Sequence, residues 1–229
     1  MSESPLPNPR TPDSRLTTPD FSVAAIILAA GRSSRMGAFK PLLPFGSKTV
    51  VETCIDNLRA GGVEQFVIVI GQDKRAAELK ERLRNLDLTF AVNPDPHSEM
   101  NASIACGVDA LSAVSKVVVI NPVDHAAVPG DVVRQVIAEW KNGALLVKPT
   151  CNQRGGHPVL VDLSFREELL QLDPNTGLKA FFNQHQALVR RVEVKTNLIA
   201  RDMDTWDDYA ALHREVFGVS PPNSPFQSA

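Results

Sequence analysis

The sequence contains few cysteines, and none is placed for a common cross-link or metal site. Its 229 residues include only Cys54, Cys106 and Cys151. These residues are widely separated and form no C-x-x-C pair, which argues against a disulfide framework and against a zinc site. An odd number of dispersed cysteines is typical of a reducing compartment, so we expect a cytoplasmic protein.

An excess of charge of either sign is also absent. There are 24 lysines and arginines against 26 aspartates and glutamates, which gives a formal net charge of −2. A general nucleic-acid binder usually shows a clustered basic excess, so we expect no nucleic-acid partner. Any site for a phosphate group must therefore be local.

Long hydrophobic runs are missing as well. No segment approaches about 18 consecutive apolar residues, and the N-terminus has no uninterrupted apolar core, so we expect neither a membrane span nor a signal peptide. Residues 1–20 are rich in Pro, Ser, Thr and Asp, and residues 218–229 are interrupted by prolines. Both segments have little to bury and are predicted to be disordered extensions of one folded domain over residues 21–217.

An apolar run followed by a cationic loop dominates what is present. Residues 23–28 show no period-two alternation, which predicts a central strand of a parallel sheet that is covered on both faces. The loop that follows brings small residues and three cations together: Ala29, Ala30, Gly31, Arg32, Ser33, Arg35, Gly37 and Lys40. Because open α/β sheets bind ligands at the carboxyl ends of their strands, we expect this loop to hold a polyanion. It matches neither G-x-G-x-x-G nor the Walker pattern, which argues against a dinucleotide dehydrogenase and a Walker-type ATPase.

Strands and helices alternate through the rest of the chain, which predicts an α/β fold with a mostly parallel sheet and right-handed crossovers. Thr49 can cap a helix that ends at Gly61-Gly62. Further strands are expected at about 66–70, 88–92, 116–120, 144–148, 159–161 and 188–194. Further helices are expected at about 76–84, 101–115, 164–172 and 178–186, with a last one after residue 204.

Polar residues follow several of these strands. Asp124 comes after the strand at 116–120 and can serve as an oxygen ligand for Mg²⁺, which needs only one or two carboxylates besides phosphate and water. The alternative is that Asp124 caps the next helix, whose first turn is marked by Pro129. Asn93 follows the strand at 88–92 and begins a proline-rich loop, and Ser103 lies near the start of the next helix.

The loop resembles the signature loop of the MobA-like nucleotidyltransferases, the family that includes the molybdenum cofactor cytidylyltransferases. The match runs through Leu28-Ala29-Ala30-Gly31-x-Ser33-x-Arg35-Met36-Gly37-x-x-Lys40. The resemblance implies a three-layer Rossmann-like nucleotidyltransferase fold and a loop that wraps a nucleoside triphosphate. It also implies nucleotide contacts by Leu28, Ala29, Ala30, Gly31, Arg32, Ser33, Arg35, Gly37, Lys40, Asn93 and Ser103.

Later motifs extend the resemblance along the folded body. Pro122-Val123-Asp124 and Asp202-Met203-Asp204-Thr205 resemble the family's metal-binding segments, which implies Mg²⁺ ligands at Asp124 and Asp204, with Asp202 as the alternative to Asp204. Gly156-His157-Pro158 resembles an element beside the acceptor substrate, so His157 and His125 are implied to bind the acceptor. The chain departs from the family pattern at Glu99, Ala105 and Ala126.

The resemblance implies that a nucleoside monophosphate moves from a nucleoside triphosphate to a phosphate-bearing small molecule, with release of pyrophosphate. Lys40, Arg35 and Asp124 are the implied catalytic residues. The Ala29-Ala30-Gly31 run resembles the cytidylyl branch, which favours CTP and a molybdopterin acceptor. A sugar-phosphate nucleotidyltransferase and a non-catalytic nucleotide-binding homologue are the alternatives. The oligomeric state stays open, and a monomer is compatible with the sequence.

Overall fold

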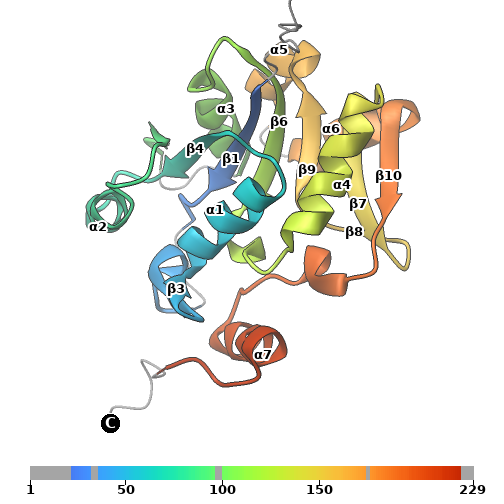
Figure 1. Ribbon diagram of the computed structural model, residues 1–229. Helices are drawn as coiled ribbons and strands as arrows, with labels where there is room; N and C mark the ends of the chain where they lie inside the picture. The colour runs from blue at the N-terminus through green and yellow to red at the C-terminus, as the bar shows by residue number, and fades with distance from the viewer. Residues whose placement is uncertain (1–21, 32–35, 96–99, 174–175, 223–229) are drawn as a thin grey trace, which may run out of the picture.

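The computed structural model describes residues 22–31, 36–95, 100–173 and 176–222. A single large sheet runs through the molecule in the order β10-β7-β9-β6-β1-β4-β5, and β8 pairs with β7 (Figure 1). Its strands are β1 (Ser22–Leu28), β4 (Gln65–Ile70), β5 (Thr89–Val92), β6 (Ser115–Pro122), β7 (Leu146–Cys151), β8 (Arg154–Gly155), β9 (Val159–Asp162) and β10 (Val189–Glu193).

β1 lies at the centre of the sheet and pairs in parallel with β4 on one side and β6 on the other. Among the long strands only β9 runs against its neighbours, because it is antiparallel to both β6 and β7. The short β8 is antiparallel to β7. The predicted α/β class and mostly parallel sheet are therefore confirmed.

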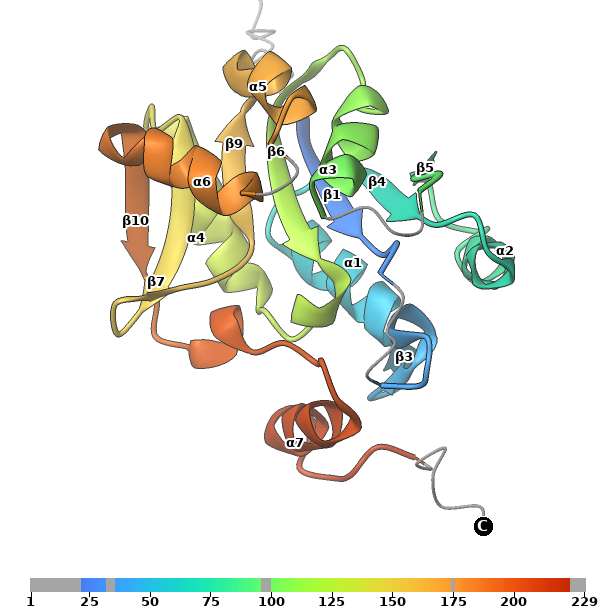
Figure 2. The same cartoon turned by 180° about the vertical axis from the view of Figure 1, so that it is seen from behind.

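Helices cover both faces of the sheet, which gives three layers. α1 (Val50–Ala60) and α4 (Gly130–Lys141) pack on one face, and α3 (Met100–Asp109), α5 (Arg166–Leu170) and α6 (Gly177–Gln184) pack on the other (Figures 1 and 2). Alternate residues of β1 serve the two cores: Ala25 and Ile27 face the first, and Ala24 and Ile26 the second. This double burial explains why the strand shows no polar alternation.

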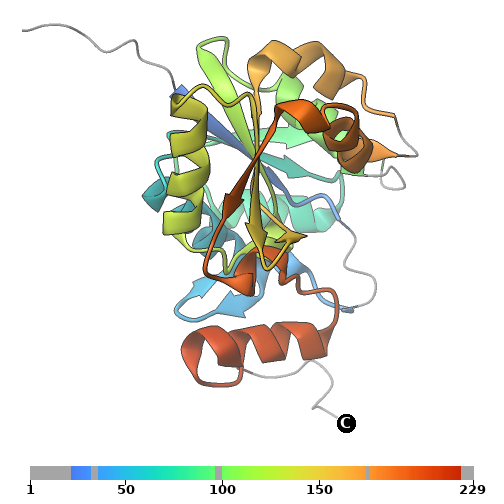
Figure 3. The ribbon, with the colours of Figure 1, turned by 90° about the vertical axis from the view of Figure 1, so that its right-hand side faces the viewer.

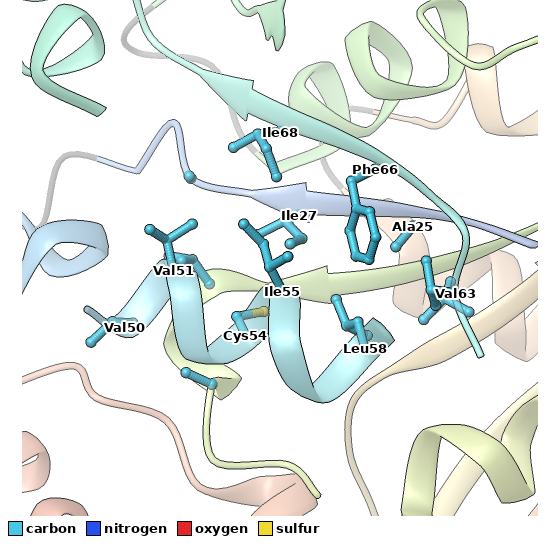
Figure 4. Close-up of a cluster of buried hydrophobic side chains, with 14 of the residues drawn as sticks. Ala25, Ile27, Val50, Val51, Cys54, Ile55, Leu58, Val63, Phe66 and Ile68 are labelled. Carbon is cyan, nitrogen blue, oxygen red and sulfur yellow. The ribbon is translucent and has the colours of Figure 1, made fainter. Parts of the chain in front are cut away.

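α1 follows directly from its sequence. Thr49 and Glu52 form a capping box, and Glu52 donates its backbone N–H to the Thr49 hydroxyl. Its apolar stripe points at the sheet, where Ile55 faces Ile27 (Figure 4). The predicted cap and the end of the helix before Gly61 are confirmed.

Several predicted boundaries were wrong. α3 ends at Asp109 and not near residue 115, because residues 110–114 form the turn that enters β6. β7 begins at Leu146 and not at 144, because the backbone N–H of Ala144 still bonds the α4 carbonyl of Glu139. The helix expected at 164–172 is a short 3-10 turn, Leu163–Phe165, followed by the five residues of α5.

α2 (Lys74–Arg82) lies beyond β4 near the edge of the sheet, and α7 (Trp206–Phe217) lies below the carboxyl ends of the strands (Figures 1 and 3). α7 packs on the hairpin of β2 (Pro44–Phe45) and β3 (Lys48–Thr49). The Tyr209 hydroxyl donates to the carbonyl of Pro44, and the Gly46 N–H donates to His213 Nε2 at 3.3 Å. We call these contacts the C-terminal strap. They fix the segment before α7 relative to the segment after β1.

The described elements extend from Ser22, where the first strand begins, to Phe217, where the last helix ends. The domain limits of 21–217 stay a prediction. No helix within the described parts of the chain is both long and apolar enough to cross a membrane.

Candidate active site

The loop after β1 begins at the centre of the sheet's carboxyl edge. Leu28 is the last residue of the strand, and the backbone N–H of Ala29 donates to the Val69 carbonyl at 2.9 Å. Ala30 is half-buried, whereas Gly31 is exposed and a Cβ there would meet no atom within 4 Å. The predicted contacts at Arg32, Ser33 and Arg35 lie outside the described residues. The described part of the chain resumes at Met36. It then turns at Gly37, whose φ of +67° is a backbone conformation that favours glycine.

Lys40 is the residue on which the site converges. Its Nζ lies 3.2 Å from Asp124 Oδ2 and 2.9 Å from Asp204 Oδ1. Lys40 opens the 3-10 turn Lys40–Leu42, Asp124 lies in the turn Val123–His125 directly after β6, and Asp204 lies just before α7. Three segments that are far apart in the sequence therefore meet at one point.

The surroundings make this a strong electrostatic centre. Lys40 is 9% exposed, so its ammonium group depends on the two carboxylates for charge compensation. Asp124 does not cap α4, whose N-cap is Pro129. The predicted metal ligands Asp124 and Asp204 are thus brought together. Asp202 is exposed and, within the described parts of the chain, makes no ion pair with Lys40.

The donor set fits a cation that is bound together with a ligand. Two carboxylates face the same ammonium group, and the described residues contain no group of three or more His, Cys, Asp or Glu arranged for a metal ion. Mg²⁺ accepts such a site, because it retains water and phosphate oxygens in its octahedral shell. Its position as the partner of Asp124 and Asp204 stays a prediction.

A first cavity lies at the carboxyl edge of the sheet, next to the start of the loop after β1. It has a volume of about 460 Å³ and opens between the ends of β1, β4 and β5. Asn93 lines it and is 4% exposed, while its Nδ2 donates to Ser103 Oγ at 2.9 Å. Ser103 does not line the cavity, so its hydroxyl positions Asn93. The predicted Ala30 also lines it, as do Pro94 and Asp95 of the same loop as Asn93. Sequence reasoning missed the other lining residues, which are Gly71, Gln72, Asp73 and Arg75.

Two histidines lie on the other side of Asp124. The rings of His125 and His157 are 4.7 Å apart, and the Nδ1 atoms of both are buried without a hydrogen-bond partner. Burial lowers the pKa of His157 to about 3, and the neighbouring His125 lowers it further. Burial also lowers the pKa of His125, although Asp124 opposes this change. Both rings are therefore neutral near pH 7.

A second cavity begins at these histidines. It has a volume of about 550 Å³ and lies between α6, β7, β8 and the 3-10 turn Asn197–Ala200. His125 and His157 line it, in agreement with their predicted place beside an acceptor, though no contact with an acceptor is tested. Sequence reasoning missed Lys148, Arg154 and Lys179 in its walls. A lysine at position 148 in an otherwise apolar strand was the signal that could have revealed the first of them.

The departures from the family pattern are structurally mild where they are described. Ala126 is 1% exposed and its carbonyl accepts a hydrogen bond from Asn57 Nδ2 at 2.9 Å. A proline at this position would retain that acceptor, because proline lacks only the donor. Ala105 lies on α3 and is half-buried, and Glu99 lies outside the described residues.

Taken together, the sheet and the converging lysine and carboxylates place the chain among the nucleotidyltransferases, enzymes that bind a nucleoside triphosphate and an acceptor. Within that class the chain belongs to the family of the MobA-like NTP transferase domain, whose model matches residues 25–189. The resemblance seen in the sequence is thereby confirmed, and so is the assignment as a transferase.

Relatives agree with this assignment. The chain is 31% identical to the molybdenum cofactor cytidylyltransferase of Escherichia coli K12, over 82% of this chain and 94% of that protein. It is 27% identical to nicotine blue oxidoreductase of Paenarthrobacter nicotinovorans, over 80% and 92%. The crystal structure of Rv0371c from Mycobacterium tuberculosis has the same fold, with a TM-score of 0.75, 24% identity and coverage of 85% and 98%. A further structure of Rv0371c is a complex with manganese.

Proposed function

We propose that this enzyme transfers CMP from CTP to the phosphate of a molybdopterin-type acceptor, with Mg²⁺, and releases pyrophosphate. One observation carries the proposal. The Lys40 ammonium group contacts both Asp124 and Asp204. One cavity opens at the ends of β1, β4 and β5, and a second is lined by His125, which directly follows Asp124. A lysine and two carboxylates, with two cavities formed by segments that follow the same strands, suit the joining of two phosphate-bearing molecules.

The chemistry needs alignment more than activation. An oxygen of the acceptor phosphate forms a bond to the α-phosphorus of CTP, and the bond from that phosphorus to the bridging oxygen of the β-phosphate breaks. The electron pair of the broken bond leaves with pyrophosphate. A phosphate monoester is already anionic near neutral pH, so no residue has to remove a proton. Lys40 supplies positive charge where negative charge accumulates.

Asp124 and Asp204 would hold the metal ion. When bound, Mg²⁺ would neutralise phosphate charge and hold the triphosphate in line. The carboxylates reach their positions from β6 and from the segment before α7, and the C-terminal strap keeps the second of them in place. The manganese complex of Rv0371c supports a divalent ion in this fold.

CTP is favoured by the sequence of the loop and by a relative. Ala29-Ala30-Gly31 resembles the cytidylyl branch of the family, and the E. coli relative is a cytidylyltransferase by name. The three cysteines are free thiols, which supports the proposed cytoplasmic location.

The test is a substrate screen with pyrophosphate release as the readout. The purified chain is mixed with Mg²⁺, one of the four NTPs and either molybdenum-loaded molybdopterin or glucose 1-phosphate. The proposal predicts release that requires CTP, metal and molybdopterin together. Turnover with glucose 1-phosphate instead would establish a sugar-phosphate nucleotidyltransferase, and tight CTP binding without release would establish a non-catalytic homologue.

A second candidate rests on the similarity to nicotine blue oxidoreductase. An oxidoreductase of this fold would use the first cavity for a dinucleotide and would release no pyrophosphate. Adding NADH or NADPH with an electron-accepting dye to the same screen separates the two. Oxidation of the reduced nucleotide, with no pyrophosphate formed, would replace our proposal.

A further inference from the structure

The second cavity carries more positive charge than the fold requires. Lys148, Arg154 and Lys179 line its walls on β7, β8 and α6. Within the described parts of the chain, no ion pair joins any of the three to a carboxylate. We call these three residues the cationic cluster. Figure 2 shows α6 in front of β7, and the two elements contribute Lys179 and Lys148 to the lining of one cavity.

The fold makes room for Lys148 at the centre of this cluster. A Cβ on Gly155 would lie 2.3 Å from Lys148 Cε, so the lysine stem occupies the space that glycine leaves. Lys148 is also in register with Arg191 of β10. Burial lowers the pKa of Lys148, and the charges of Arg191 and Lys179 lower it further.

Clustered charge of one sign lowers the stability of a fold, and departures of this kind are expected at functional sites. If these three residues served only the stability of the fold, a neighbouring carboxylate side chain would reduce the repulsion between their charges. Its absence among the described neighbours leaves the charge available to a ligand. A concave site of about 550 Å³ suits a small molecule better than a protein surface.

The position of the cluster decides which part of a ligand it contacts. His125 lines the same cavity and directly follows Asp124, which marks the end where the acceptor phosphate would react. The cationic cluster lies on the walls formed by β7, β8 and α6. The reacting phosphate would lie near Asp124, where Lys40 already supplies one positive charge, so the three further cations on these walls are available to another anionic group of the same molecule.

We propose that the acceptor carries a second anionic group, separate from the phosphate that reacts, and that Lys148, Arg154 and Lys179 bind it. This inference rests on the proposed function and narrows its acceptor. A hexose 1-phosphate has no second anionic group, whereas molybdenum-loaded molybdopterin has one at its metal-bearing end. The cluster would thus select between the two acceptor classes.

The test measures binding without turnover. Equilibrium dialysis under anaerobic conditions gives the Kd of molybdenum-loaded molybdopterin, and parallel titrations give those of glucose 1-phosphate and CTP. Lys148→Met keeps the stem and removes the charge, Lys148→Arg restores the charge, and Lys179→Met tests the opposite wall. Lys116→Met is the matched control, because Lys116 is an exposed lysine near the start of β6, at the other edge of the sheet.

We expect Lys148→Met and Lys179→Met each to raise the Kd of molybdopterin about tenfold, the effect of one lost charge-assisted contact. Lys148→Arg should recover most of that loss. The affinities for CTP and glucose 1-phosphate should not change, and Lys116→Met should match the wild type for every probe.

The outcomes separate this inference from the proposed function. Wild-type affinity in both lysine variants would overturn the inference even if CTP transfer is found. Charge-dependent binding of molybdopterin without any transfer would leave the inference standing and remove the proposed function. If the wild-type chain does not bind molybdopterin, the inference is wrong.

Discussion

The two cavities of this enzyme are built in different ways. The first lies at the ends of three neighbouring parallel strands, and its one arginine is paired, because Arg75 donates to Asp73 at 2.8 Å. The second is assembled from α6, β7, β8 and two 3-10 turns, and its lysines and arginine have no carboxylate partner among the described residues. The first cavity suits a ligand that is recognised by backbone and shape. The second cavity has positive charges, unpaired within the described parts of the chain, that can bind an anionic ligand.

Lys40 lies where the two sides meet, so its loss should harm both. Lys40→Met removes the cation between Asp124 and Asp204. We expect a loss of about 2–4 kcal/mol of transition-state stabilisation, by analogy with the loss of an oxyanion donor. The measurement is kcat/KM for pyrophosphate release. Lys48→Met, which removes an exposed lysine of β3, is the control. Full activity of Lys40→Met would refute the role assigned to Lys40.

Substitutions of the aspartates test whether the site at Lys40 also holds a metal ion. Asp204→Asn retains the shape of the side chain and removes its charge. We expect the Mg²⁺ concentration for half-maximal rate to rise about 10- to 100-fold, as for other losses at metal sites. Direct titration with Mn²⁺, followed by its electron paramagnetic resonance signal in the presence of CTP, gives a second readout. Asp202→Asn should change neither quantity, and a larger effect of Asp202→Asn would transfer the ligand role to Asp202.

Two glycines offer a matched pair of substitutions, one for each side. Gly31→Ala adds a methyl group into open space at the start of the loop, and Gly155→Ala adds one where Lys148 now lies. Neither substitution should change the melting temperature. We expect Gly31→Ala to raise KM only for CTP, and Gly155→Ala to raise KM only for the acceptor, each by about tenfold or less. If both variants changed KM for both substrates by the same factor, the two glycines would not serve different substrates, and the prediction would be wrong.

The last effect concerns pH and a histidine of the second cavity. The pKa of His157 is about 3 in the fold because the ring is buried, whereas it is near the ordinary value of 6.5 in the unfolded chain. Below pH 6.5 the unfolded chain binds a proton that the folded chain does not, so stability falls as the pH decreases towards 3. The cost is about 1 kcal/mol per pH unit. Urea unfolding between pH 7 and 5 should show a shallower loss in His157→Gln than in the wild type.

The loop after β1 and the residues near Lys40 could be predicted from the sequence because the information that places them is local. The apolar run of residues 23–28 predicted a central strand. The small residues and Lys40 that follow this strand belong to one segment of the chain. The capping box at Thr49 likewise depends on residues three apart. Asp124 could be placed at the same edge because parallel strands end together.

The cationic cluster of the second cavity could not be predicted from the sequence, although His125 and His157 of the same cavity were, because the residues of the cluster meet only through long-range pairing. Lys148 acquires its neighbours from the register of β7 with β10 and from the packing of α6. The antiparallel insertion of β9 between β6 and β7 has no signature in a run of three apolar residues. The observed boundaries of α3 and β7 differ from the predicted ones for a similar reason. Turn hydrogen bonds that lie outside the apolar pattern of each element determine where the element begins or ends.

The C-terminal strap has a consequence for how the site comes apart. Asp204 reaches Lys40 from a segment that Tyr209 and His213 bond to the hairpin. Met203, Tyr209 and Leu212 also belong to the buried core cluster that covers one face of the sheet. Opening of α7 would remove these side chains from the core and would withdraw the Asp204 carboxylate from Lys40 at the same time. The burial of α7 and the integrity of the site are therefore coupled, and amide hydrogen exchange would report this coupling residue by residue.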